Sequence, residues 1–416
     1  MSTPVDTAQQ GNRGRLATGV GYFRQSGPAW LAGGLNIGGA SVTNAVILAS
    51  ATGLVFGWVV IPAVVAIWAA TYACVKIAVV ARKNPLAVMR DEVHPALAWV
   101  NGGAVLLVNL VFYTINIVLG TSALQLVFPQ LGARAWGVAM VGVVALMALL
   151  PGRIKVAEKL LQVFLYILAL TYVVALFIVP VDWSGVGEMF TFSLPTDQNT
   201  VLLFTAVLGA ALAINVPTIQ SYGTVERKWG TDRLPLIRFE TGMLNLLLMF
   251  VSLAVIVVVG STLYPAGITA TSAVTAAESL RPVTGDLSAI LFAIGLLGAV
   301  LTTAVVQTSV AGYVVSDLLR WPAGLKDKKF KAVQGVMVLI GFSVPFLGWN
   351  PFDWASWGSA FNATFMPIGV GTWWYLVNKK SLMGEHRAGR GMNTALAVSM
   401  LICLVTAVRF WYVTFS

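Results

Sequence analysis

The chain consists of eleven long apolar segments separated by short polar loops. Each segment approaches or exceeds the ~20 apolar residues that an α-helix needs to cross a bilayer. The pattern therefore predicts an all-α polytopic membrane protein with eleven transmembrane helices. The predicted spans are residues 28–53, 54–81, 97–128, 134–151, 158–181, 200–226, 236–264, 286–320, 330–349, 352–378 and 391–414.

Two of these segments contain residues that disfavour a continuous helix. The first has four glycines between Gly33 and Gly39, around Asn36, and each glycine lowers helix stability by roughly 1 kcal/mol relative to alanine. The sixth contains Asn215 followed by Pro217. Unwound backbone inside a bilayer is tolerated only where it is buried in protein or lines a cavity. Interruptions at corresponding places in two halves of a chain indicate the midplane binding site of a transporter.

Composition and charge support the membrane assignment. Of the 416 residues, 58% are hydrophobic and 10% are charged, and the net charge of +10 comes from Lys and Arg gathered in alternate loops. The opposite loops hold only Arg134, Arg281 and, near the end, Arg409. This bias predicts a multi-pass protein of the cytoplasmic membrane with its N-terminus in the cytoplasm and its C-terminus outside. The basic charge is thus topological, and we expect no nucleic-acid partner.

The start of the chain and the two cysteines do not change this membrane assignment. The polar start of the chain lacks the apolar core and cleavage site of a signal peptide. Cys74 and Cys403 both lie inside apolar spans, where cysteine behaves as a small buried side chain, so we expect no disulfide framework.

Spans one to five and six to ten can be laid over each other so that Asn36 and Asn215 coincide. Because five is odd, the two halves have opposite orientations, which is the 5+5 inverted repeat of LeuT-type transporters with broken helices 1 and 6. The predicted organisation is a cytoplasmic tail at 1–26, a transporter core at 27–390 with repeats at about 28–181 and 200–378, and an eleventh helix at 391–416.

Several short motifs resemble those of one transporter superfamily. They are Gly27-Pro28-Ala29-Trp30, the run from Asn215 to Tyr222, Arg238-Phe239-Glu240, Gly295 to Ala299, and Leu382 to Glu385. In this order and spacing the chain resembles the NRAMP (natural resistance-associated macrophage protein) superfamily of metal transporters over nearly its full length. The resemblance implies a secondary transporter that works by alternating access. No nucleophile–base pair is visible in the predicted core, so we expect no enzymatic activity.

The resemblance ends where the metal chemistry of that superfamily lies. Its first break reads Asp-Pro-Gly-Asn and its sixth reads Met-Pro-His, whereas this chain has Asn36-Ile37-Gly38-Gly39 and Val216-Pro217-Thr218. A divalent cation needs negative ligands or a cage of many oxygens, and a soft or borderline metal needs sulfur or imidazole. The predicted midplane offers neither carboxylate nor histidine, so we expect no transition-metal site and no resident cofactor.

Neutral hydrogen-bonding side chains take the place of the metal ligands. Asn109, Tyr113 and Asn116 share one face of the third span at i, i+4 and i+7. A structural role between helices is the alternative for the asparagines and for Tyr113, and close packing is the alternative for Gly38 and Gly39. The predicted substrate-binding residues are Asn36, Gly38, Gly39, Thr43, Tyr113, Asn116, Asn215, Val216, Thr218, Gln220 and Asn362.

These residues, with the positive dipole ends of the half-helices, predict transport of a small polar or anionic organic solute, such as a carboxylate or amino-acid derivative. Two alternatives stay open: an importer of magnesium or manganese, and a non-transporting membrane sensor. In LeuT-like proteins, hydroxyls on the eighth helix bind sodium with carbonyls from the first break, so this resemblance implies a sodium site here, although coupling to protons or to no ion also stays open. The candidate sodium ligands are Thr302, Thr303, Thr308 and Ser309.

Overall fold

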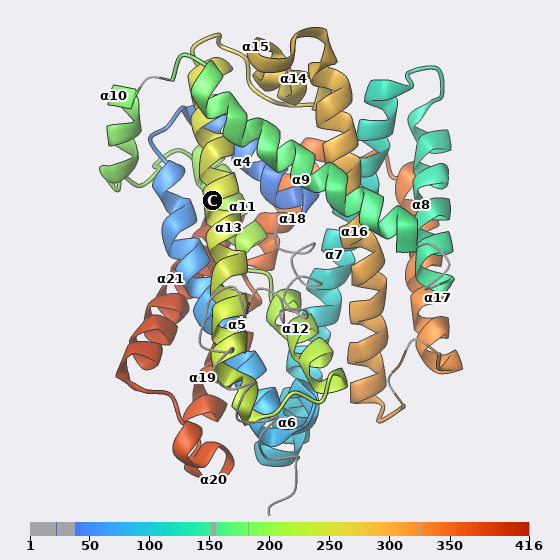
Figure 1. Cartoon of the computed structure of the whole chain (residues 1–416), viewed down its shortest axis with the longest axis vertical. Helices are drawn as coiled ribbons and strands as arrows, with labels where there is room; N and C mark the ends of the chain where they lie inside the picture. Colours follow the sequence, from blue (N-terminus) through green and yellow to red (C-terminus); the bar gives the residue numbers. More distant parts are fainter. Residues whose placement is uncertain are drawn as a thin grey trace, which may run out of the picture.

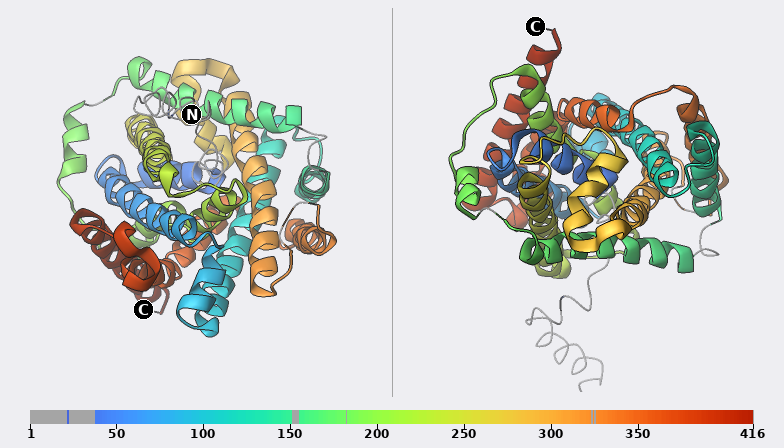
Figure 2. Two further views of the ribbon diagram at one scale, coloured as in Figure 1. Left: turned by 60° about the horizontal axis from the view of Figure 1, so that its bottom comes forward. Right: turned by 90° about the horizontal axis from the view of Figure 1, so that it is seen from above.

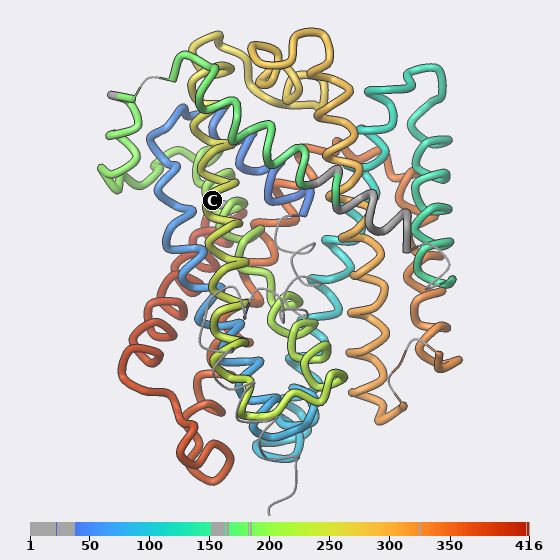
Figure 3. The backbone as a smooth tube through the Cα atoms, in the orientation of Figure 1, coloured from blue at the N-terminus to red at the C-terminus, as the bar shows by residue number. Residues whose placement is uncertain are grey.

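A computed structural model describes residues 22, 38–150, 155–181, 183–322, 324 and 326–415 (Figures 1 and 3). Within these residues the regular structure is helical, with no strand. The principal helices are α4 (Gly39–Thr52), α5 (Val60–Ala81), α7 (Pro95–Val127), α8 (Ala133–Leu149), α9 (Lys155–Ile178), α11 (Gln198–Ala211), α12 (Asn215–Glu226), α13 (Leu234–Thr262), α16 (Ser288–Leu318), α17 (Lys328–Ser343), α18 (Pro351–Asn362), α19 (Met366–Asn378) and α21 (Arg390–Phe415).

Each predicted span coincides with at least one of these helices, and the all-α membrane fold class is confirmed. Seven helical segments in the described part of the chain are long and apolar enough to cross a membrane. Three shorter apolar helices, including α4 and α8, also coincide with predicted spans. The count of eleven crossings and the bounds of the two repeats stay predictions.

The sixth span is broken, as the sequence predicts. Helix α11 ends at Ala211, and α12 begins at Asn215 with Pro217 in its first turn. Proline is tolerated in the first turn because the amide hydrogen that it lacks would have no helical partner there. On the first span, α4 begins at Gly39 after the extended Gly38, and the residues from 23 to 37 lie outside the described part.

The tenth span differs from the prediction of one continuous helix. It consists of α18 and α19, with α19 starting at Met366 and carrying Pro367 in its first turn. The physical reason is the same as in the sixth span: a proline inside a helix removes one hydrogen bond and clashes with the preceding turn.

The helices pack in pairs that relate the two halves of the chain. Helix α4 packs against α11, α5 against α13, α7 against α16, and α8 against α17, which are spans one and six, two and seven, three and eight, and four and nine (Figure 1). Span five (α9) lies on α13 and α16, and span ten lies on their counterparts α5 and α7 (Figure 2). This exchange is the arrangement expected of two repeats related by a two-fold axis.

Short helices cover the two ends of the bundle. Helices α14 (Ala273–Ala277) and α15 (Arg281–Thr284) lie at one end, and α6 (Pro85–Glu92) and α20 (Lys380–Met383) lie at the other (Figure 1). The basic loops that follow α5, α12 and α19 adjoin this second end. The charge bias read from the sequence is thus a bias between the two ends of the molecule, and which end faces the cytoplasm stays a prediction.

Candidate functional site

A small cavity lies between the start of α4 and the break of the sixth span. Its volume is about 10 Å³, which is room for a single water molecule. Helices α4, α7, α11 and α16 and the start of α12 all contribute to its wall, so spans from both halves of the chain meet here. The lining residues are Gly38, Ala40, Ser41, Phe112, Asn116, Ala210, Ala213, Asn215, Thr303 and Gln307.

Amide side chains form a chain of hydrogen bonds from α16 to α12. The Asn109 Nδ2 group donates to the backbone oxygen of Gln307 at 2.8 Å, and Asn215 Nδ2 donates to Asn109 Oδ1 at 3.4 Å. Since a backbone carbonyl can only accept, its bond fixes which way the Asn109 amide points, and Asn109 in turn orients Asn215. The oxygen of Asn215 is therefore the atom left without a partner.

Asn116 is oriented by the same logic. Its Nδ2 donates to the backbone oxygen of Phe112 at 2.7 Å and to Gln307 Oε1 at 3.4 Å, and its Oδ1 has no partner. Asn116 and Asn215 are each only 1% exposed. A buried acceptor without a partner costs about 1–3 kcal/mol. Two such oxygens on one cavity favour a ligand that brings hydrogen-bond donors or positive charge.

Two helix N-termini also reach the cavity. Helix α4 begins at Gly39 and α12 begins at Asn215, so the N-terminal dipole ends of both helices lie at its edge. Gly39 has room for no side chain: a Cβ there would lie 2.3 Å from the Val300 side chain and 3.4 Å from Asn116 Oδ1. The cavity thus combines acceptor oxygens with two positive dipole ends, and none of its lining residues is charged.

Only some of the binding residues predicted on the first and sixth spans line the cavity. Gly38 and Asn215 line the cavity, whereas Asn36 lies outside the described residues. Four other predicted binding residues are buried but do not line the cavity: Thr43, Val216, Thr218 and Gln220. The Thr218 hydroxyl donates to the backbone oxygen of Ile214 in its own helix.

Tyr113 and Asn362 lie at contacts between helices. Asn362 Nδ2 donates to the backbone oxygens of Gly209 and Leu212, which the end of α11 would otherwise leave without partners. Tyr113 is fully buried, and its hydroxyl is so close to α17 that a Cβ on Gly341 would lie 2.6 Å from it. Neither residue is among those lining the cavity.

The four candidate sodium ligands do not form one group. Thr303 lines the cavity, and Thr302 donates to the backbone oxygen of Gly298 one turn earlier. The hydroxyls of Thr308 and Ser309 both accept from Gln334 Nε2 of α17, at 3.3 Å and 3.2 Å. These two residues therefore serve the contact between α16 and α17.

Gln307 is one of the polar cavity residues that the sequence prediction missed. It lies one turn after Thr303 on α16 and contacts both Asn109 and Asn116. A glutamine inside the apolar 286–320 span was the available signal, because such residues are rare in transmembrane helices unless they bond to another helix. Asn109, which orients Asn215, was recognised as part of the polar face of its helix but not as a site residue.

Polar bonds close the cavity on the side of α14 and α15. Asn44 Nδ2 donates to Ser359 Oγ at 2.9 Å, and the Ser356 hydroxyl donates to Asn44 Oδ1 at 3.2 Å, which ties α4 to α18. Asn362 ties the same helix to α11. Among the described residues, no three His, Cys, Asp or Glu side chains come together as a metal site would require.

Solved structures of transporters have folds similar to this chain. A mutant of the Eremococcus coleocola manganese transporter aligns with a TM-score of 0.77 at 13% identity, covering 93% of this chain and 86% of that one. MhsT in complex with L-phenylalanine aligns at 0.63 with 15% identity and coverages of 95% and 98%. Mhp1, a nucleobase-cation-symport-1 family transporter, aligns at 0.59 with 13% identity and coverages of 93% and 90%. No curated protein matches the chain.

At these identities the structures show the fold, which is the LeuT-type fold expected from the sequence. The family assignment comes from the sequence itself. The family model described as "Natural resistance-associated macrophage protein-like" matches residues 29–413, nearly the whole chain. The chain therefore belongs to the natural resistance-associated macrophage protein-like (Nramp) family of membrane transporters.

Proposed function

We propose that this transporter carries a small polar organic solute by alternating access. The solute presents an ammonium group or N–H donors to the oxygens of Asn116 and Asn215. A carboxylate on the same solute faces the N-termini of α4 and α12, where the positive ends of the helix dipoles favour negative charge. The observation that carries the proposal is the pair of fixed, unpaired amide oxygens on one uncharged cavity.

The small volume of the cavity is what we expect of a closed form in the transport cycle. Room for one water is too little for an organic solute, so loading requires α4 and α11 to separate from α7 and α16. The bonds from Asn44 and Asn362 to their partner helices are the ones that break when the side of α14 opens. This is the rocking of one helix group against another that alternating access requires.

A matched pair of asparagines on α7 tests the site. Asn116 and Asn101 both donate to the backbone oxygen four residues earlier and to a side chain on another helix, but only Asn116 lines the cavity. We expect Asn116→Ala to weaken solute binding by about 10- to 150-fold, the equivalent of a charge-assisted hydrogen bond of about 1.5–3 kcal/mol. Asn101→Ala should leave binding unchanged.

The measurement is a thermal-shift screen of the purified protein over amines, amino acids and organic acids, followed by titration of the best ligand and uptake into proteoliposomes. Equal effects of Asn116→Ala and Asn101→Ala on binding would remove the site assignment.

Uptake with sodium replaced by choline tests the coupling ion. Uptake that persists undiminished would eliminate sodium drive through Thr303.

A divalent cation is the second candidate. The free oxygens of Asn116 and Asn215 are acceptors that a partly hydrated magnesium or manganese ion can use through its waters. The likeness to a manganese transporter supports this candidate, while the absence of a carboxylate among the lining residues opposes it. Isothermal titration with manganese, cadmium and magnesium decides: micromolar binding that Asn116→Ala removes would put the metal first.

A further inference from the structure

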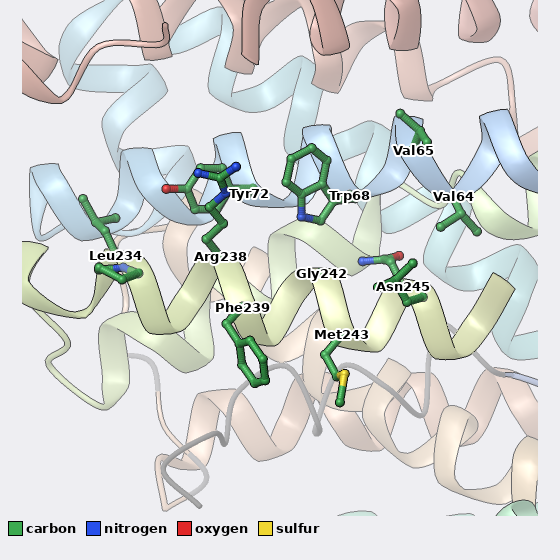
Figure 4. Close-up of a pocket in the computed structure, with 12 residues that line it drawn as sticks. Val64, Val65, Trp68, Tyr72, Leu234, Arg238, Phe239, Gly242, Met243 and Asn245 are labelled. Atoms are coloured by element: carbon green, nitrogen blue, oxygen red, sulfur yellow. The ribbon is translucent and has the colours of Figure 1, made fainter. Parts of the chain in front are cut away.

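A second and larger hollow lies away from the central cavity, between α5 and α13 (Figure 4). Its volume is about 730 Å³, and most of its wall is apolar. Val65 is 43% exposed, Met243 is 40% exposed and Leu246 is 57% exposed, so the groove opens on the outside of the helix bundle. Tyr22, near the start of the chain, packs on one edge of the groove, with its ring centroid 5.5 Å from that of Phe239. In a membrane protein the exposed side chains beside this contact face lipid. The groove therefore offers an acyl chain a place between two helices.

One end of the groove carries positive charge. Arg238 lines it near the start of α13, and Figure 4 shows its side chain beside Tyr72 of α5. Lys76, one turn further along α5, has its Nζ 6.0 Å from the Tyr72 ring centroid. No carboxylate among the described residues lies within ion-pair distance of either cation. Lys76 lies beside the groove, and its Nζ donates to the backbone oxygen of Arg387 at 3.5 Å. Arg238 is therefore the lining cation without a carboxylate partner, and it favours an anionic headgroup at this end of the groove.

Two polar atoms without partners lie further along the groove. Trp68 Nε1 is a buried donor, and Figure 4 shows its indole lying against α13 at Gly242, where a Cβ would be 3.6 Å from the nitrogen. Asn245 is 2% exposed, and because its Nδ2 donates to the backbone oxygen of Thr241, its free Oδ1 is the remaining acceptor. Trp68 is one helical turn from Tyr72, about 6 Å along the axis. That is the depth at which a phospholipid has its ester carbonyls below the phosphate.

We propose that this groove binds one anionic glycerophospholipid. Its phosphate lies between Arg238 and Lys76, an ester carbonyl accepts from Trp68 Nε1, and an acyl chain covers Val65, Met243 and Leu246. Asn245 Oδ1 accepts from a water retained beside the ester. The site is separate from the transport cavity, and its occupation holds α5 and α13, the paired second and seventh spans, at a fixed distance.

Native mass spectrometry of the full chain titrated with phosphatidylglycerol or phosphatidylcholine tests the proposal. We expect one phosphatidylglycerol to bind at least tenfold more tightly than phosphatidylcholine, and Arg238→Gln to remove that preference. Arg227→Gln is the matched control, because it deletes an exposed cation that follows α12 and does not line the groove. Equal binding of the two lipids, or equal effects of the two variants, would overturn the proposal.

A second variant blocks the groove without altering charge. Gly242→Leu places a side chain against Trp68, and we expect it to abolish the bound lipid while the thermal midpoint stays within a few degrees. A phosphatidylglycerol with a photoreactive acyl chain should label residues 64–72 and 234–246 in the wild type and not in Gly242→Leu. Labelling elsewhere overturns the proposal. A second copy of the chain covering the groove would also overturn the proposal. That outcome would appear as dimers that Gly242→Leu dissociates.

Discussion

Asn116 and Asn215 derive their chemistry from neighbours that the sequence does not place beside them. An asparagine amide offers a donor and an acceptor, and which of the two faces a cavity depends on the bonds of the other. Here the Phe112 backbone oxygen takes the Asn116 donor and Asn109 Oδ1 takes the Asn215 donor, so both free atoms are acceptors. The sequence identified the two residues as polar groups near the breaks. The preference for a donor-bearing ligand follows only from the contacts.

Gly209 is the residue at which α11 comes closest to α18. A Cβ there would lie 1.8 Å from the backbone oxygen of Ser359, which cannot move without shifting the helix. We expect Gly209→Ala to destabilise the protein by about 1–3 kcal/mol or more, the usual cost of overpacking. The measurement is the thermal unfolding midpoint in detergent.

Gly103 provides the control for that substitution. It is an exposed glycine inside α7, and a Cβ there would meet nothing within 4 Å. Gly103→Ala should leave the midpoint unchanged or raise it, since alanine favours helix by roughly 0.5–1 kcal/mol over glycine. A Gly209→Ala protein as stable as Gly103→Ala would contradict the close approach of α11 and α18.

Helix α12 is held to α16 by two reciprocal pairs. The Tyr222 hydroxyl of α12 donates to Asp317 Oδ2 at 2.8 Å, and the Tyr313 hydroxyl of α16 donates to Glu226 Oε1 at 2.6 Å. The two tyrosine rings stack with centroids 5.2 Å apart. Arg90 of α6 joins the group by donating to the Asp317 backbone oxygen at 3.0 Å. Helix α12 carries Asn215 at its other end, so a motion of this helix changes the cavity that Asn215 lines.

Cys74 reports on the position of α12, because its Sγ lies 3.0 Å from Ser221 Oγ and it is fully buried. Tyr222→Phe removes one hydrogen bond to a carboxylate, a loss of about 1.5–3 kcal/mol. We expect maleimide to label Cys74 about tenfold faster or more in this variant, in a Cys403→Ser background. Mass spectrometry of the labelled protein gives the rate.

Tyr172→Phe is the corresponding control on α9. Its hydroxyl is also buried, but it contacts only the neutral Ser279 hydroxyl and lies away from α12. The Cys74 labelling rate should match the wild type in this variant. Equal rates in Tyr222→Phe and Tyr172→Phe would show that the pair with Asp317 does not restrain α12.

On the scale of the whole molecule, the paired packing of the two halves supports opposite orientations and an odd number of crossings. Together with the charge bias of the loops, this predicts an N-terminus in the cytoplasm and a C-terminus outside. We expect a membrane-impermeant maleimide to label Ser416→Cys but not Ser2→Cys in intact cells, in a background with Cys74 and Cys403 replaced by serine. Lysis should expose both positions. Labelling of both ends in intact cells would mean an even number of crossings.

The sequence by itself determined the class of the molecule. Long apolar segments, prolines and glycines act locally, so the helices and the break at Asn215 could be predicted, and the family motifs were enough for the assignment that the family model confirms. The tenth span carries Pro367 as well, but it was predicted as one span without a break.

Only the tertiary structure decided which polar groups meet. Asn109 and Asn215 are 106 positions apart, and Asn116 and Gln307 are 191 apart, so no local pattern could show that they bond to each other. Asn362 likewise donates to backbone oxygens of α11, and Tyr113 contacts α17, far from each in the sequence. Helix type follows from neighbouring residues, whereas the orientation of a buried amide follows from whichever helix packs against it.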